Sequence, residues 1–378
     1  MVILGLVSLL NDAASEMVTP LLPLFLTVTL GAGPAVVGLI EGAAESAASI
    51  LKLASGWLTD RGWNSKRLVT GGYALSNGVR PLIGLALGWS WVLALRCLDR
   101  VGKGLRTAPR DAMIAAVTAP DVRGRAFGFH RSMDHLGAVI GPLLAFALLS
   151  AGLSIRDVFL WSGVIGVGVV GLLLFGVPSP RTRSVAPSTS LHWRTLDRRL
   201  RRLLLASGAL ALATAPEVFL VLWATDNGIE VAMIPLLWAA ASVAKAAVAL
   251  PAGALSDRFG RMVMLIGGWT ARVATLLALA WAPPTLALVP VLFLAYAATL
   301  AITEAAERSL VGDIATPAQR GTAFGWYHLM SGIFILPGAV FFGSLWQWAG
   351  SSNAFTAAAG VTLLAAGFML ASVRPRES

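Results

Sequence analysis

The chain contains 378 residues, of which 57% are hydrophobic and only 13% are charged, and its mean hydropathy is +0.76. Because soluble domains usually carry about 25% charged residues, this composition excludes a soluble globular protein and a disordered chain. The formal net charge of +10 is compatible with nucleic-acid binding, so the distribution of the basic residues decides that question. The single cysteine, Cys97, allows no internal disulfide.

Apolar stretches of about 20 residues, the length that a helix needs to cross a bilayer, recur along the whole chain. They predict twelve helices, with approximate bounds 3–30, 36–58, 68–88, 90–117, 125–151, 155–178, 203–224, 231–255, 262–282, 286–312, 322–348 and 352–373. The first stretch is as apolar as a signal peptide, but it contains Asp12 and Glu16 and lacks a basic leader, so we expect a mature helix. The predicted fold class is an all-α integral membrane protein.

Basic residues concentrate in every second loop between these helices. They are Arg61, Lys66, Arg67, Arg123, Arg125, Arg258, Arg261 and Arg320, with Arg374 and Arg376 in the tail. The longest polar stretch, 179–202, holds seven more arginines and predicts a linker between two halves, 1–178 and 203–378. Since basic loops face the cytoplasm, we expect both termini and the linker to be cytoplasmic, in a bacterial-type inner membrane. This distribution accounts for most of the net charge, so no nucleic-acid partner is expected.

Two pairs of segments repeat at one offset. Residues 56–61 (GWLTDR) match 253–258 (GALSDR), and residues 120–128 match 317–325, both at an offset of 197 residues. Two independent matches at the same offset indicate an internal duplication. Because six helices per half is an even number, both halves enter the membrane in the same direction, as two parallel repeats.

Twelve spans, a basic central loop, parallel halves and a Gly-x-x-x-Asp-Arg loop after spans 2 and 8 resemble the major facilitator superfamily of secondary transporters. The resemblance covers essentially the whole chain. The second-half loop follows the family pattern well, whereas Trp63 and Asn64 stand where the first-half loop usually has Gly and Arg. In the family this loop is a cytoplasmic gate, so the resemblance assigns gating to Asp60, Arg61, Asp257 and Arg258. The alternative is a turn that only determines topology.

A second motif lies in the predicted span 125–151. Its sequence from Gly137 through Gly141 and Pro142 resembles the Gly-x-x-x-Gly-Pro motif of antiporter members of the family, although Ala145 stands where Gly is typical. Small residues four apart let helices approach closely, and proline bends a helix. The resemblance implies export by exchange and a gating role for this segment; the alternative is ordinary helix packing.

The predicted span 90–117 carries a basic stripe. At about 100° per residue, one face collects Arg96, Arg100, Lys103, Thr107 and Arg110. Ionisable groups inside a membrane normally pair or face a water-filled pathway. The stripe therefore predicts an anionic substrate bound by Arg96, Arg100 and Lys103, with Arg110 and Asp111 as a gate near the cytoplasm. The alternative is a buried network neutralised by Asp99, Asp12 and Glu16.

Acidic residues in the first two spans are candidates for proton coupling. Asp12 and Glu16 are one turn apart beside Asn11, and Glu41 and Glu45 repeat that spacing. Two neighbouring carboxylates in a dry site resist joint ionisation, which favours a reversible proton carrier. The family resemblance places spans 1, 4, 7 and 10 around the central cavity, so it favours Asp12, Glu16 and Asp99 as proton carriers and Asn11 as a substrate ligand.

The predicted span 125–151 adds His130, Arg131, Asp134 and His135. A histidine titrates near physiological pH, so we expect Asp134 and His135 to take part in proton coupling and Arg131 in substrate binding. His130 and Met133 alone are weak support for a soft-metal site, and no metal is predicted.

The second half contains fewer charged residues. Glu217 and Glu304 are candidate substrate ligands. At the 197-residue offset, Arg110-Asp111 aligns with Glu307-Arg308 in reversed charge order. We expect the two pairs to meet as a gate, so the exchange Arg110→Glu with Glu307→Arg should rescue either single variant.

The predicted function is a proton-coupled antiporter that exports a small organic anion or an acidic amphiphile by alternating access. One alternative is a proton symporter that imports an anionic metabolite or a siderophore-like metal chelate; another is a sensor that does not transport. No nucleotide-binding loop, metal-ligand cluster or nucleophile constellation occurs in the sequence, so neither an enzyme nor a cofactor is expected. The family resemblance implies a monomer.

Overall fold

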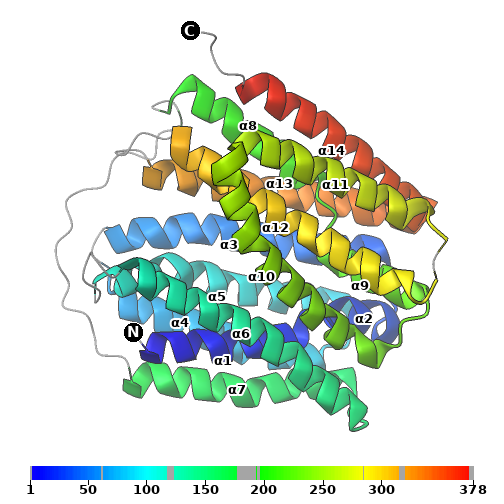
Figure 1. The fold of residues 1–378 in the computed structure, drawn as a ribbon. Coiled ribbons are helices and arrows are strands. Elements are labelled where there is room, and N and C mark those ends of the chain that lie inside the picture. Colours follow the sequence, from blue (N-terminus) through cyan, green and yellow to red (C-terminus); the bar gives the residue numbers. More distant parts are fainter. Residues whose placement is uncertain are drawn as a thin grey trace. The chain divides into compact units, whose positions relative to one another are not determined.

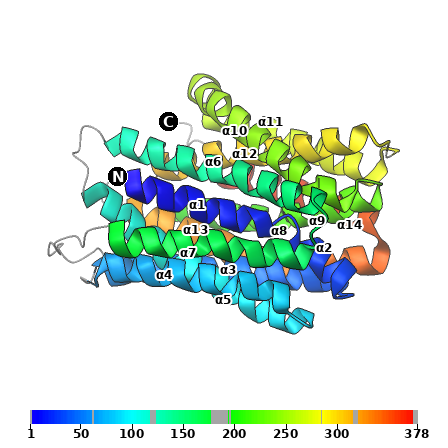
Figure 2. The ribbon, with the colours of Figure 1, turned by 90° about the horizontal axis from the view of Figure 1, so that it is seen from below.

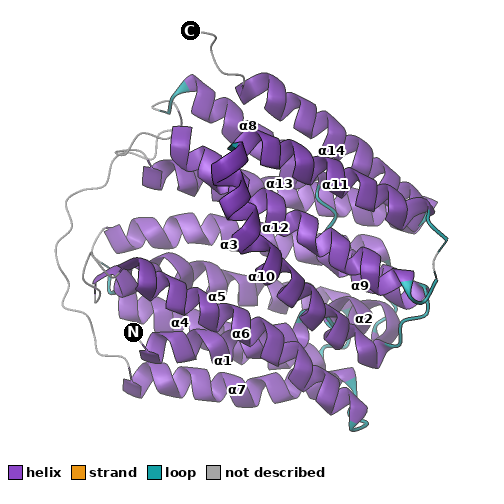
Figure 3. Ribbon diagram, viewed as in Figure 1, coloured by secondary structure: helices purple, strands orange, loops and turns teal. Residues whose placement is uncertain are grey.

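The computed structural model describes residues 2–60, 63–116, 123–176, 193, 196–283, 285–314 and 320–373. Every regular element in these ranges is a helix, and no strand occurs among them (Figure 3). Within the described residues, nine helical segments are long and apolar enough to cross a membrane. The predicted span 90–117 is not one of them, because its helix carries too many charged side chains.

The first half of the chain contains nine helical elements. They are α1 (Val2–Val18), α2 (Leu22–Leu24), η1 (Phe25–Thr29), α3 (Pro34–Asp60), α4 (Ser65–Val79), η2 (Pro81–Leu85), α5 (Trp89–Ala116), α6 (Arg123–Ser150) and α7 (Ile155–Gly176). The second half contains α8 (Arg198–Ala213), α9 (Glu217–Asp226), η5 (Val231–Met233), α10 (Ile234–Phe259), α11 (Arg261–Trp281), α12 (Leu288–Ile314), α13 (Arg320–Ala349) and α14 (Ser351–Val373). These counts apply to the described ranges.

Several predicted spans are interrupted rather than continuous, including the span 68–88, which consists of α4 and η2. The span 203–224 consists of α8 and α9, separated by Thr214, Ala215 and Pro216. Thr214 has an extended backbone (φ −78°, ψ 115°). Pro216 lacks an N–H group and disfavours helical geometry in the residue before it, which explains the break. The span 3–30 is similarly divided into α1, α2 and η1.

The chain forms two units by its internal packing. Unit 1 comprises residues 1–32, 43–188 and 229–242, and unit 2 comprises residues 33–42, 189–228 and 243–378. Helices α3 and α10 therefore contribute one part to each unit. The predicted boundaries at residues 178 and 203 stay a prediction.

In unit 1, α1 packs against α6 and α7, and α4 packs against α5 and α7 (Figures 1 and 2). Close approach of α6 to α1 depends on glycine. A Cβ atom on Gly137 would lie 3.0 Å from the Cβ of Asp12, and one on Gly141 would collide with the backbone of Ala13. The apolar core beside these contacts is formed by Leu4, Val7, Val69, Tyr73, Met113, Ile114, Val169 and Leu173.

In unit 2, α8 packs against α13 and α14, and α11 packs against α12 and α14. This is the pattern of unit 1 displaced along the sequence, because the offset of 197 residues carries α1, α4, α5, α6 and α7 onto α8, α11, α12, α13 and α14. The packing thus supports the duplication inferred from the repeated segments. The described helices thus confirm the predicted fold class, an all-α membrane protein with an internal repeat.

Candidate functional site

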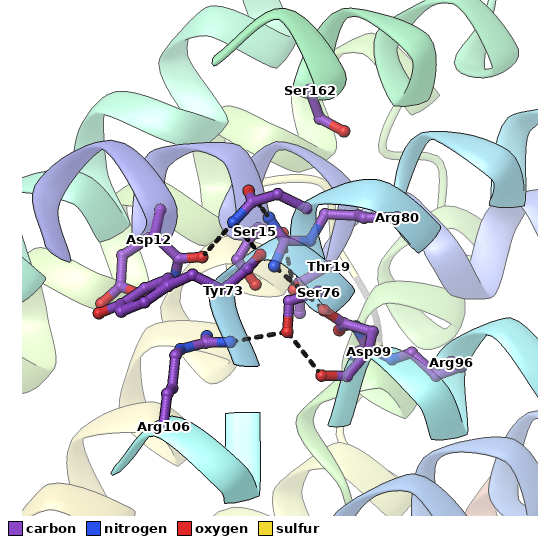
Figure 4. Close-up of polar contacts among 12 residues, drawn as sticks. Asp12, Ser15, Thr19, Tyr73, Ser76, Arg80, Arg96, Asp99, Arg106 and Ser162 are labelled. Atoms are coloured by element: carbon purple, nitrogen blue, oxygen red, sulfur yellow. Dashed lines mark hydrogen bonds and ion pairs between the residues drawn. The ribbon is translucent and has the colours of Figure 1, made fainter. Parts of the chain in front are cut away.

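Asp99 on α5 lies between two arginines inside unit 1 (Figure 4). Arg80 Nη2 is 3.1 Å from Asp99 Oδ1, and Arg96 Nη1 is 3.4 Å from Asp99 Oδ2. The three side chains are at most 2% exposed. Burial of a charge is costly unless it is paired and hydrogen-bonded, which explains why the two arginines converge on one carboxylate. We call Arg80, Asp99 and Arg96 the arginine triad.

Arg106, about two helical turns beyond Asp99 on α5, contacts neutral groups. Its Nη1 donates to Ser76 Oγ at 2.6 Å, and its guanidinium lies 4.5 Å from the centre of the Tyr73 ring. Ser76 Oγ in turn donates to the backbone carbonyl of Asp99 at 2.8 Å. Figure 4 shows Ser76 between Arg106 and Asp99. The Ser76 hydroxyl on α4 thus connects the Arg106 side chain to the Asp99 backbone, two positions that lie about two turns apart on α5.

Two buried amides connect the arginine triad to α1. Arg80 Nη1 donates to Asn77 Oδ1 at 3.2 Å, and Asn77 Nδ2 donates to Asn11 Oδ1 at 3.1 Å. Asn11 Nδ2 donates to Asp12 Oδ1 at 3.0 Å. In this series of hydrogen bonds, each donor lies on the Arg80 side and each acceptor on the Asp12 side. We call these contacts the amide relay.

Arg100 and Lys103 continue the predicted basic stripe. Arg100 is 9% exposed, and its Nε has no hydrogen-bond partner among the described residues. Lys103 is half-buried. The nearby acid Glu45 on α3 pairs with Lys52 at 3.6 Å. This part of unit 1 therefore contains basic groups whose charge the described contacts do not fully neutralise.

A second polar group joins α6, α1 and α5. Asp134 lies 3.4 Å from His130 Nδ1 and accepts a hydrogen bond from Ser8. Ser8 also accepts from Arg110 Nη1 at 3.4 Å, and Arg110 pairs with Asp111 at 3.2 Å. The structure thus places Arg110 within reach of Asp134 through one hydroxyl.

The other predicted residues of unit 1 lie at the edge of these groups or outside them. Arg131 is 62% exposed and pairs with Asp134 at 3.7 Å, and His135 is exposed. Glu16 accepts a hydrogen bond from Trp238 Nε1 at 2.9 Å. Pro142 lies inside α6, after the glycines that contact α1.

The candidates of unit 2 form separate contacts. Glu217 pairs with Lys245 at 2.9 Å, Glu307 accepts from the Tyr327 hydroxyl at 3.2 Å, and Glu304 is exposed. Arg258 is exposed beside the Phe259 ring. Arg61 and the side chains of Asp60, Asp257 and Arg308 lie outside the described residues, so their gating role stays a prediction.

The sequence prediction missed Ser76 and Asn77 on α4 and Arg80, which directly follows that helix. A signal was present, because Arg80 is an ionisable residue inside the predicted span 68–88, and such residues mark functional or paired positions. Ser76 and Asn77 gave no comparable signal, since small polar residues are frequent in membrane helices.

Two repeated helical units that bury ionic groups among apolar spans define the class: a multi-pass membrane protein. The family model of the Major Facilitator Superfamily matches residues 4–223 and 203–378. The chain belongs to this superfamily of transporters, as its motifs predicted, and it is a transporter rather than an enzyme.

Known proteins resemble it over different lengths. An uncharacterized MFS-type transporter of Methanocaldococcus jannaschii is 30% identical over 354 residues, which cover 91% of this chain and 88% of that protein. The multidrug resistance protein MdtH of Photorhabdus laumondii is 30% identical over 185 residues, 49% of this chain and 44% of that protein. The solved structure of the nucleoside transporter NupG aligns with a TM-score of 0.78 at 14% identity, over 99% of each chain, a likeness of fold alone.

Proposed function

We propose that this transporter is a proton-coupled antiporter that exports a small organic anion or an acidic amphiphile by alternating access. The observation that carries the proposal is the surplus of buried basic groups on α5 and at the C-terminal end of α4. Arg80 and Arg96 share Asp99, Arg106 has neutral partners, and the Nε of Arg100 has no hydrogen-bond partner among the described residues. A positively charged interior attracts anions and repels cations.

Arg100 is the residue that we assign to the substrate. A guanidinium presents a planar set of N–H donors that matches a carboxylate or a sulfonate in two-point contact. Arg80 and Arg96 are committed to Asp99, whereas Arg100 retains an unpaired donor. Lys103, three residues further on the same helix, supplies a second positive charge.

Asp12 and Asp134 are the residues that we assign to the proton. Asp12 is joined to the arginine triad by the amide relay, and Asp134 is joined to Arg110 through Ser8. Each acid is therefore linked by hydrogen bonds to a basic group of α4 or α5. Gain or loss of a proton changes the local charge by one, which alters the affinity of the site for an anion.

Export is favoured by two similarities. The segment from Gly137 to Pro142 resembles the antiporter motif of the family, and about half of the chain is similar to the multidrug resistance protein MdtH. The basic loops support an inner-membrane location with both termini in the cytoplasm, and we expect the protein to act as a monomer.

The test is transport by the purified chain in proteoliposomes with a trapped pH indicator. Addition of aromatic carboxylates or sulfonates outside the vesicles should release protons from the lumen. Neutral and cationic analogues, added in the same way, serve as controls and should release none. Arg100→Ala should lower the initial rate at least about tenfold, the loss expected when one charge-assisted hydrogen bond of about 1.5–3 kcal/mol is removed. The matched control is Arg202→Ala, which removes an exposed arginine of α8 and should leave the rate unchanged.

Selective proton release with cations, at equal rates in Arg100→Ala and the unchanged protein, would contradict the assignment of an anion. Anion uptake that stops when the proton gradient is dissipated would instead indicate import by symport.

A further inference from the structure

Unit 2 holds a buried cation of its own, Arg272 on α11. Its side chain is 4% exposed. Nη2 donates to Thr303 Oγ1 at 2.5 Å and Nη1 to Thr214 Oγ1 at 3.5 Å, while Nε has no hydrogen-bond partner among the described residues. At contact distance, the guanidinium therefore meets neutral hydroxyl oxygens.

The equivalent helix pair of unit 1 neutralises its cation differently. There Arg80, at the C-terminal end of α4, pairs with Asp99 on α5. At the 197-residue offset Asp99 corresponds to Tyr296 on α12, whose hydroxyl donates to the Ala215 carbonyl at 2.8 Å. The α11 and α12 pair has a phenol where its counterpart has the carboxylate. It also buries a guanidinium at a different position, because at the same offset Arg272 corresponds to Leu75 and Arg80 to Leu277.

The acids of unit 2 have other partners. Glu217 pairs with Lys245, and Asp313 pairs with Arg261 at 3.3 Å. Glu307 lies one turn beyond Thr303 on α12 and accepts a hydrogen bond from Tyr327. No carboxylate of the described residues forms an ion pair with Arg272. Glu307 is close enough to Arg272 to interact with it electrostatically, but it forms no ion pair with the guanidinium. The Nε of Arg272 is therefore a buried donor without an acceptor among the described residues, and a buried donor of a charged group is costly to leave unpaired.

The two threonines orient the guanidinium without neutralising it. Thr214 Oγ1 donates to the Leu210 carbonyl at 2.8 Å, and Thr303 Oγ1 donates to the Leu300 carbonyl at 3.2 Å. Their oxygens are therefore presented to Arg272 as acceptors. The Nε edge that remains is the one with which arginine binds a carboxylate side-on. Thr214 also begins the break between α8 and α9, and interrupted membrane helices commonly border binding sites.

We propose that the Nε edge of Arg272 binds a monovalent anion in unit 2. The anion is either the carboxylate of an organic acid or an inorganic ion such as chloride, because both offer one negative charge to the same donors. This inference goes beyond the proposed function, which depends on Arg100 in unit 1, and it holds for an anion that stays bound as well as for one that is transported.

The test compares Thr303→Asp with Thr303→Asn in the full-length protein. These side chains have nearly the same shape, but only Asp places a carboxylate beside Arg272. A ligand that binds the folded state raises the apparent Tm by mass action. In potassium chloride and potassium acetate, compared with potassium sulfate at equal ionic strength, we expect the unchanged protein and Thr303→Asn to gain stability. Thr303→Asp should show no such gain, because its own carboxylate lies beside the Arg272 guanidinium and neutralises the charge that would attract the anion.

General effects of sulfate on hydration act on both variants alike, so the difference between the variants is the measurement. Stabilisation by chloride alone identifies an inorganic anion, and stabilisation by acetate identifies an organic acid group. Equal responses of Thr303→Asp and Thr303→Asn, or no anion-selective gain in the unchanged protein, would overturn the proposal. If Thr303→Asp does not fold, Arg272→Gln replaces it, with the same loss of the gain expected.

The two proposals fail separately. Loss of anion-driven proton release in Arg100→Ala, with equal anion responses of the two Thr303 variants, would support the transport function and reject the Arg272 site. The reverse result would support a bound anion in a protein whose transported substrate is not an anion.

Discussion

Asn11 and Asn77 are small residues with a directional role. A side-chain amide both donates and accepts hydrogen bonds. The two amides therefore connect the Arg80 guanidinium to the Asp12 carboxylate by a series of hydrogen bonds that all run in one direction, without direct contact between the two charges. If Asp12 binds a proton, one of its oxygens becomes a hydrogen-bond donor. The neutral carboxyl group then attracts the Asn11 donor less strongly, so the fixed direction of these hydrogen bonds is less favoured. The relay is therefore the physical connection through which the acid on α1 affects the arginine triad.

Asn77→Leu should test this connection. Leu has a similar volume but leaves Asn11 and Arg80 each without one buried partner, which costs about 1–3 kcal/mol of folding free energy. We expect a lower apparent Tm and a pH dependence of transport that differs from that of the unchanged protein. The control is Asn353→Leu, because Asn353 is exposed at the start of α14 and donates to the Ala349 carbonyl at the end of α13, both within unit 2. Identical pH profiles of Asn77→Leu and the unchanged protein would show that the relay has a structural role only.

Helix α5 illustrates how an element with many charges is placed in an apolar environment. Glycines bring its backbone close to both neighbours: a Cβ on Gly102 would lie 2.5 Å from Ser76 Oγ, and one on Gly104 would lie 2.7 Å from the Ala48 carbonyl. This proximity lets Ser55 Oγ on α3 donate to the Gly104 carbonyl at 2.8 Å. The small residues therefore set the distances at which α5 can use polar partners on α3 and α4.

The glycines of α6 should be equally sensitive. Gly141→Val places a side chain against the backbone of Ala13, so we expect a loss of about 1–3 kcal/mol from overpacking and a lower apparent Tm. Gly168→Val on α7 is the control, because nothing lies within 4 Å of a Cβ there. Equal stability of the two variants would mean that α6 can move away from α1 at no cost, and that the motif acts otherwise than by packing.

The division of α3 between the two units has a consequence for the whole molecule. Residues 33–42 belong to unit 2. A Cβ atom added to Gly42 would lie 2.9 Å from the Leu336 Cα, and the Ala35 N–H donates to Gln347 Oε1 at 3.2 Å. A chain cut between residues 184 and 185 should therefore copurify as two co-expressed fragments. Gly38→Val, which collides with the Ala339 carbonyl, should reduce recovery of the pair, while Gly71→Val in open space should not. Independent purification of the two fragments would contradict this expectation.

Much of the architecture could be predicted from periodicity, hydropathy and repeats: the family, the helical class and the duplication. The interruptions at Thr214–Pro216 and near Pro20 were missed, since a hydropathy average does not register a few non-helical residues. The basic stripe placed Arg96 and Arg100 on one face of α5, but it could not show that Arg96 shares a carboxylate with Arg80 while Arg100 Nε has no hydrogen-bond partner among the described residues. Contacts between helices depend on rotation and tilt, which a single sequence does not specify.

The ion pair between Arg80 and Asp99 joins two helices that are adjacent in sequence, and this affects how the protein enters the membrane. During biosynthesis, a charged residue at the centre of a helix costs about 2.5–3.5 kcal/mol for insertion through the translocon, and α5 alone carries several. Insertion of α4 and α5 together, as a hairpin, allows Arg80 and Asp99 to neutralise each other before either meets lipid. We therefore expect the nascent chain to hold α4 at the translocon until α5 has been synthesised.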